Sequence, residues 1–104
     1  MKASQPHDET VVAMLKADPE MADVYLATAL EEANLPGGQF ALLAALRHIA
    51  EAQGMASVAE KAGMPRESLY RALSPRGNPT IKTLLAVLAA SGLQLGVTRT
   101  EQHA

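Results

Sequence analysis

Apolar and polar positions along this chain follow a period close to that of an α-helix. Apolar residues recur three or four positions apart in several separate runs, and each run is bounded by proline, glycine or a polar residue. The pattern predicts helices over residues 8–17, 19–33, 39–53, 56–62, 66–73 and 80–91. An all-α fold of about five to six helices is therefore expected.

The breaks between these helices carry signals of their own. Asp18 is expected to be the N-cap of a helix that begins at Pro19. Gly54 is expected to end a helix in a left-handed conformation, Thr80 to cap the last helix, and Gly92 to stop it. In that last helix five side chains are expected to pack inward: Ile81, Leu84, Leu85, Val87 and Leu88.

Beyond Gly92 the pattern changes. Residues 93–97, Leu-Gln-Leu-Gly-Val, alternate apolar with small or polar positions, as a short strand does. A lone strand needs a partner, so this segment either pairs with a second copy in a homodimer or packs as a tail on its own domain. The chain divides into residues 1–18, a disordered arm (1–7) followed by a short helix, and one helical domain over residues 19–99.

Composition narrows the class of protein. The 104 residues are 48% hydrophobic but only 3% aromatic, which predicts a single core of Ala, Leu, Val and Met. The chain has no cysteine and three scattered histidines, so we expect no disulfide, no metal and no cofactor. No run of about 18 apolar residues is present, and the N-terminus lacks an apolar signal core, so we expect no membrane span and a cytoplasmic location.

Residues 55–74 have the layout of two short helices around a tight turn. Gly63 suits the turn because it tolerates a positive φ, and Ala59, four positions earlier, is the small residue needed where two helices cross steeply. The side chains expected to face inward are Val58, Leu69, Ala72 and Leu73. This is the helix-turn-helix layout, with residues 66–73 as the candidate recognition helix, and it predicts sequence-specific binding of double-stranded DNA.

The net charge of −2 at first argues against DNA, but the charge is unevenly distributed. Residues 1–53 contain three Lys or Arg and eight Asp or Glu, which gives −5, whereas residues 54–99 contain six and two, which gives +4. The basic half is the one that holds the motif, where phosphate contacts would need it.

Five side chains of the candidate recognition helix are expected to contact DNA. Arg66 suits the O6 and N7 atoms of guanine, while Glu67 and Ser68 suit neighbouring bases. Arg71 suits a base or a phosphate, and Tyr70 a phosphate or a thymine methyl. The alternative is ordinary solvated surface, with Glu67 paired to Arg71 four positions later.

Residues that flank this helix are expected to hold the DNA backbone. Ser57 lies at the N-terminus of helix 56–62, where free N–H groups favour phosphate. Four more polar residues surround the start of the last helix: Arg76, Asn78, Thr80 and Lys82. The alternative for residues 77–80 is a plain turn and helix cap, which is compatible with phosphate contact by Asn78 and Lys82.

Two polar residues in the apolar helix 39–53 favour structural explanations. Arg47 is expected to bury its stem and to pair its charged head with Glu51 or Glu32. His48 is expected at the surface, and with no cysteine or second histidine nearby it is not expected to bind metal.

Several fragments of the chain follow one another in a distinctive order. They are Ala45-Leu46-Arg47, Gly54-Met55, Leu69-Tyr70-Arg71-Ala72-Leu73-Ser74, Gly77-Asn78-Pro79 and Thr83-Leu84, with Tyr25-Leu26 and Ala29-Leu30-Glu31-Glu32 upstream. In this order they resemble the lambda-repressor/Xre-type helix-turn-helix class. Within it the chain is most similar, over about residues 20–97, to addiction-module antidote proteins, a HigA-like group of antitoxins. Residues 36–39 and the first 18 residues depart from that pattern.

The resemblance implies an antitoxin that binds a small basic RelE/ParE-like toxin and represses its own operon, usually as a dimer. The acidic residues Asp23, Glu31 and Glu32 are then either solvated surface or a docking site for that toxin. Two alternatives remain: a stand-alone transcriptional regulator without a toxin, and a helical interaction module that does not bind DNA. An enzyme is disfavoured, because no set of clustered carboxylates, histidines or nucleophiles is present.

Overall fold

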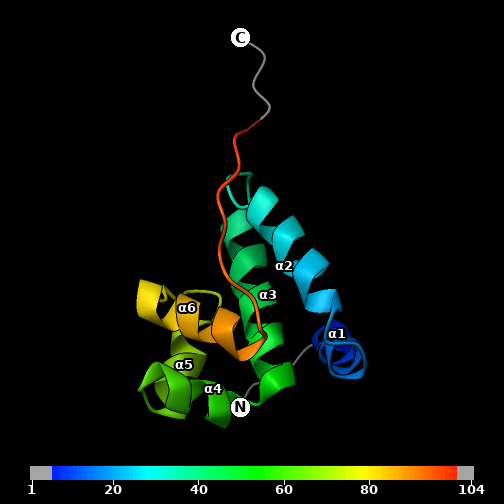
Figure 1. The fold of residues 1–104 in the computed structure, drawn as a ribbon. Helices are drawn as coiled ribbons and strands as arrows, with labels where there is room; N and C mark the ends of the chain where they lie inside the picture. The colour runs from blue at the N-terminus through cyan, green and yellow to red at the C-terminus, as the bar shows by residue number, and fades with distance from the viewer. Residues whose placement is uncertain (1–5, 101–104) are drawn as a thin grey trace.

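The structure, a computed structural model, describes residues 6–100, and within them the chain forms six α-helices joined by short loops (Figure 1). The helices are α1 (Pro6–Ala17), α2 (Met21–Glu31), α3 (Gly38–Gln53), α4 (Met55–Ala62), α5 (Arg66–Ala72) and α6 (Ile81–Ala90). The expected all-α fold is confirmed, and each helix begins and ends within two residues of its predicted bounds. Residues 1–5 of the predicted arm lie outside the described part of the chain, whereas residues 6 and 7, predicted to be disordered, belong to α1.

Helix α3 is the centre of the fold. It packs against α1 and α2 on one side and against α4 and α6 on the other (Figure 1). Its small residues Ala45 and Ala50 are almost fully buried, together with Leu46 and Ile49. Alanine at these contacts allows neighbouring helices to approach closely, which explains how a core nearly without aromatic residues is filled.

The second half of the core fixes the two shortest helices. Four side chains there have no exposed surface: Val58 of α4, Leu69 of α5, Leu73 just after α5, and Val87 of α6. Burial of each such side chain is worth about 1.5–3 kcal/mol. Of the α6 side chains expected to pack inward, Val87 and Leu88 are buried, as predicted. The prediction is wrong for Ile81 and Leu85, which are 71% and 46% exposed, because only one face of α6 meets α3 and α4.

Several of the local signals act as predicted. Gly63 ends α4 in the left-handed conformation, and Gly92 follows α6 with a φ of 73°. The side chain of Thr80 caps α6 by accepting the Thr83 N–H at 3.1 Å. Gly54 ends α3 with a positive φ of 104°, but its ψ of 108° places it outside the left-handed helical region.

The N-cap predicted at Asp18 is wrong. Residues 18–20 instead form a turn whose carbonyls accept the N–H groups of Met21, Ala22 and Asp23. Glu20 is the N-cap residue of α2, in a helical conformation and without a side-chain cap. Because this turn already satisfies the first donors of the helix, a carboxylate cap at Asp18 has no donor to accept from.

The strand considered for residues 93–97 does not form. Within residues 6–100 there is no strand to pair with it, and the segment runs extended beside α2 (Figure 1). Leu93 is half-buried and its N–H bonds to the Leu88 carbonyl at 2.8 Å, while Leu95 and Val97 are 43% and 99% exposed. None of the described helices is long and apolar enough to span a bilayer.

Candidate functional site

Helices α4 and α5 are joined by the short turn 63–65, as the motif predicts. The Met64 N–H bonds back to the Ala59 carbonyl at 3.0 Å, and Pro65 enters α5 in an extended conformation with a φ of −63°. Ala59 is buried at the helix contact. The expected inward face is confirmed for Val58, Leu69 and Leu73, whereas Ala72 is half-buried.

The outward face of α5 carries the predicted contact residues. Arg66, Glu67 and Arg71 are exposed, Tyr70 is 42% exposed and Ser68 is half-buried. Within residues 6–100 no ion pair engages either arginine, so the Glu67–Arg71 pair is not formed. Both guanidinium groups are therefore available to a ligand.

The flanking residues lie around the two ends of this helix pair. Ser57 is exposed in the first turn of α4, and Arg76, Asn78, Thr80 and Lys82 are exposed between the end of α5 and the start of α6. The Nζ of Lys82 lies 3.3 Å from where a Cβ on Gly63 would be. The fold therefore brings Lys82 beside the turn that precedes Arg66.

Two residues hold the loop after α5 in place. A Cβ on Gly77 would lie 2.0 Å from the Ala72 carbonyl oxygen, so only glycine fits where the loop passes the end of α5. Thr80 uses its hydroxyl within α6, both as the N-terminal cap and as donor to the Thr83 hydroxyl at 3.1 Å. Thr80 thus acts as a helix cap, as one of the two sequence interpretations predicts.

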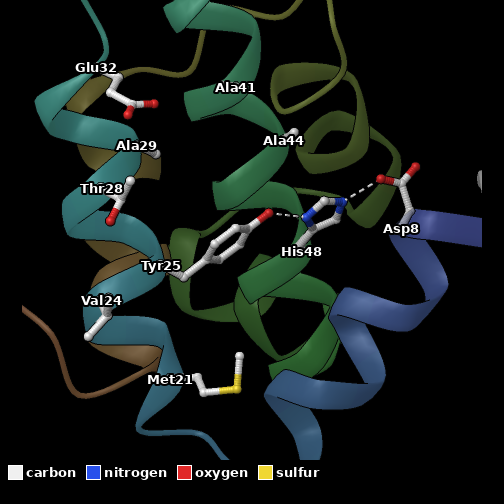
Figure 2. A pocket seen from close by; sticks show the side chains of 10 residues that line it. All are labelled: Asp8, Met21, Val24, Tyr25, Thr28, Ala29, Glu32, Ala41, Ala44 and His48. Atoms are coloured by element: carbon white, nitrogen blue, oxygen red, sulfur yellow. Dashed lines mark hydrogen bonds and ion pairs between the residues drawn. The ribbon is translucent and has the colours of Figure 1, made fainter.

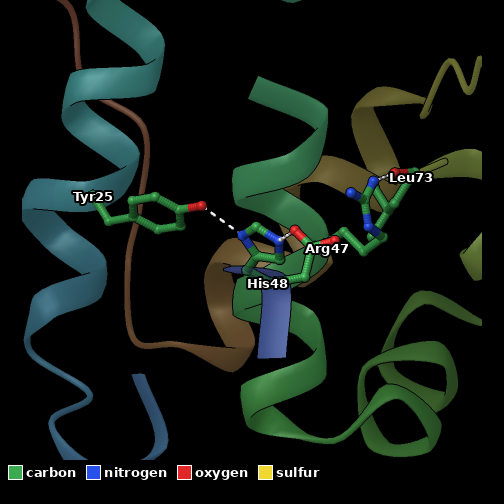
Figure 3. A network of polar contacts seen from close by, with 5 residues as sticks. Tyr25, Arg47, His48 and Leu73 are labelled. Carbon is green, nitrogen blue, oxygen red and sulfur yellow. Dashed lines mark hydrogen bonds and ion pairs between the residues drawn. The ribbon is translucent and has the colours of Figure 1, made fainter. Parts of the chain in front are cut away.

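Arg47 does not pair with an acid, which corrects the sequence prediction. Its Nη1 donates a hydrogen bond to the Leu73 carbonyl at 2.8 Å, at the C-terminal end of α5 (Figure 3). The last carbonyls of a helix lack partners within the helix and carry partial negative charge, so a guanidinium stabilises them. Arg47 thereby ties the central helix to the candidate recognition helix.

His48 is buried, not at the surface as predicted. It is 2% exposed; its Nδ1 lies 2.5 Å from the Tyr25 hydroxyl, and its Nε2 lies 2.7 Å from Asp8 Oδ1 (Figure 2). A neutral imidazole satisfies both contacts when Nε2–H donates to the carboxylate and Nδ1 accepts the phenol hydrogen. One side chain thus joins α1, α2 and α3. The sequence signal for its burial is its position three residues after Ala45, which places both residues on the same face of α3.

The electrostatic setting of Tyr25 follows from this network. Burial raises the pKa of the Tyr25 hydroxyl above its ordinary value of 10.0, and the negative charge of Asp8 raises it further. The positive charge of Arg47 acts in the opposite direction. The phenol is therefore held in its neutral, hydrogen-bonding form.

A groove between α2 and α3 was not foreseen from the sequence. It has a volume of about 640 Å³ and opens beside Tyr25 and His48, with Asp8 at one end (Figure 2). Its lining is mostly apolar. Within residues 6–100 no group of three His, Cys, Asp or Glu side chains is placed to hold a metal ion.

Comparison with known proteins identifies the family. The chain belongs to the family whose model is described as "Probable addiction module antidote protein", which matches residues 10–99. It is also 42% identical over 78 residues, 75% of this chain and 76% of the relative, to an uncharacterized protein of Haemophilus influenzae. No solved structure matches the chain. The antidote part of the resemblance is confirmed, and an antidote family is regulatory, with a toxin as its implied partner.

Proposed function

We propose that this protein is the antitoxin of a type II toxin–antitoxin pair, of the HigA-like, Xre-type helix-turn-helix class. It binds and neutralises a small basic RelE/ParE-like toxin, and as a homodimer it represses its own operon in the cytoplasm, without catalytic activity. Family membership supports the antitoxin role. The observation that carries DNA binding is the unpaired cationic face of α5, with Arg66 and Arg71 outward and Leu69 and Leu73 locked into the core.

In this proposal α5 enters the major groove. An α-helix with its side chains is about 10–12 Å across, which suits a major groove about 12 Å wide. Arg66, in the first turn, donates to guanine, and Glu67 and Ser68 read adjacent bases. Arg71 and Tyr70 lie further along the helix, toward the phosphates.

The flanking residues hold the backbone. The first turn of α4 presents free N–H groups and Ser57 to one phosphate. Arg76, Asn78 and Lys82, with the backbone of Thr80, reach the next phosphates from the start of α6. Because residues 6–53 are acidic, DNA is repelled from the α1–α2 side, which leaves that side for the toxin.

A gel-shift assay on the DNA upstream of the gene tests the DNA-binding half. The expected result is binding that prefers this DNA over unrelated sequence and weakens steeply with salt. If no DNA is retarded even at low salt, the DNA-binding proposal is wrong, and the alternative of a helical interaction module that does not bind DNA is favoured. Co-expression with the product of the adjacent gene, followed by pull-down, tests the toxin half; DNA binding without a bound toxin would favour a stand-alone regulator.

A further inference from the structure

The groove between α2 and α3 has the form of a seat for a third helix. Its α2 wall is one stripe of side chains spaced three and four residues apart: Met21, Val24, Tyr25, Thr28, Ala29 and Glu32 (Figure 2). This stripe is about 16 Å long, or three helical turns. A hollow of this length matches a short helix better than a small molecule.

The α3 wall consists of two small residues, Ala41 and Ala44, and of His48 (Figure 2). Ala41 is exposed, and on the α2 wall Val24, nearer the Met21 end, is 70% exposed. Nearer the C-terminal end of α3, the same helix is covered by α1, which is attached through Asp8 and His48. The groove thus continues the face of α3 on which α1 already packs. The alanines on this face leave room for the side chains of a further helix.

Charge selects among the possible occupants. Residues 6–33 contain seven Asp or Glu and one Lys, and no Lys or Arg lines the groove. Nucleic acid is therefore repelled. The cationic face of a second copy lies on α4–α6, and docking it here would join copies head to tail, an arrangement that does not close into a dimer.

We propose that this groove binds an amphipathic helix of the toxin, with its apolar side on Val24, Ala41 and Ala44 and a Lys or Arg against Glu32. This inference rests on the proposed antitoxin function. It narrows the acidic docking surface, because Glu32 lines the groove whereas Asp23 and Glu31 line a separate hollow on the C-terminal segment.

The test measures binding of the purified product of the adjacent gene to the full-length chain by calorimetry. Ala41→Arg and Val24→Arg fill the groove with bulk and positive charge at exposed positions. Ala13→Arg on α1 is the matched control, because it adds the same charge at an exposed position outside the groove. Thermal melting and the gel shift on the upstream DNA show that each variant is folded.

The expected result is that both groove variants bind the product about 30-fold more weakly or worse, while Ala13→Arg binds normally and all three retain DNA. Unchanged binding by the groove variants would overturn the groove and leave the proposed function intact. If the unmodified chain does not bind the product, the toxin half of the proposed function fails, and the groove inference with it. Loss of self-association in the groove variants, with product binding retained, would assign the groove to a second copy and overturn the proposal.

Discussion

Arg47 and Leu73 are 26 residues apart in the chain, yet Arg47 Nη1 donates to the Leu73 carbonyl at 2.8 Å. The bond joins the middle of the longest helix to the end of one of the shortest. It fixes where α5 ends relative to the core, and so fixes the angle at which the exposed face of α5 is presented.

We expect Arg47→Met to lower the free energy of unfolding by about 1–3 kcal/mol, because it keeps an apolar stem but leaves the carbonyl without its charged donor. Arg76→Met, at an exposed position, should cost less than about 0.5 kcal/mol. Urea unfolding followed by circular dichroism measures both. Equal costs for the two variants would show that the bond contributes nothing.

The Tyr25 hydroxyl should make stability sensitive to alkaline pH. Its folded pKa is raised by burial and by Asp8, so above pH 10 the folded state binds more protons than the unfolded state. This contribution is complete below the ordinary pKa of 10.0 and is lost as pH rises through the folded pKa. Between pH 9 and pH 11 the melting temperature should therefore fall more steeply with pH for the natural chain than for Tyr25→Phe. Parallel curves would contradict the coupling.

Gly77→Ala should destabilise the loop after α5. The added Cβ would meet the Ala72 carbonyl oxygen at 2.0 Å, which forces the loop off the helix and costs about 1–3 kcal/mol. Gly96→Ala is the control, because nothing lies within 4 Å of its Cβ position, and it should change stability by less than about 0.5 kcal/mol. Thermal unfolding of the Gly77→Ala and Gly96→Ala variants tests this prediction. Similar melting temperatures for the two would rule out the close contact at Gly77.

Arg66 and Lys82 should affect DNA binding in different ways. Arg66→Ala should cost about 1–3 kcal/mol on the preferred sequence and relax base preference, whereas Lys82→Ala should weaken all sequences alike and reduce the salt slope by about 1. Lys16→Ala, an exposed basic residue of α1, is the control and should bind normally. Titrations on specific and scrambled DNA at several salt concentrations separate these effects. Arg66→Ala binding both DNAs normally would remove α5 from the interface.

Sequence patterns predicted the helices well because each depends on nearby residues. The period of apolar positions, the glycine at 63 and the threonine at 80 act within a few residues of themselves, and the structure has them as expected. The inward face of α5 follows from the same local period. These features need no knowledge of what lies opposite.

Apart from the local N-cap at Asp18, the main errors concern residues whose partners are distant in the chain. The sequence predicts a surface position for His48, because nothing near it reveals its partners Tyr25 and Asp8, which are 23 and 40 residues away. The expected partner of Arg47 is an acid side chain, Glu51 or Glu32, whereas the actual acceptor is a backbone carbonyl, which no side-chain pattern reveals. The groove on α2 and α3 likewise exists only once two helices are placed side by side.

Helix α5 is seven residues long, well below the roughly 12–15 residues that an isolated helix needs in water. Its helical form is therefore maintained from outside, by the buried Leu69 and Leu73 and by the bond from Arg47. An excised peptide of this sequence would be coil and could not serve as a miniature binder. The surface that we propose reads DNA thus has no existence apart from the folded domain, and proteolysis of the domain would release the operator at the same moment.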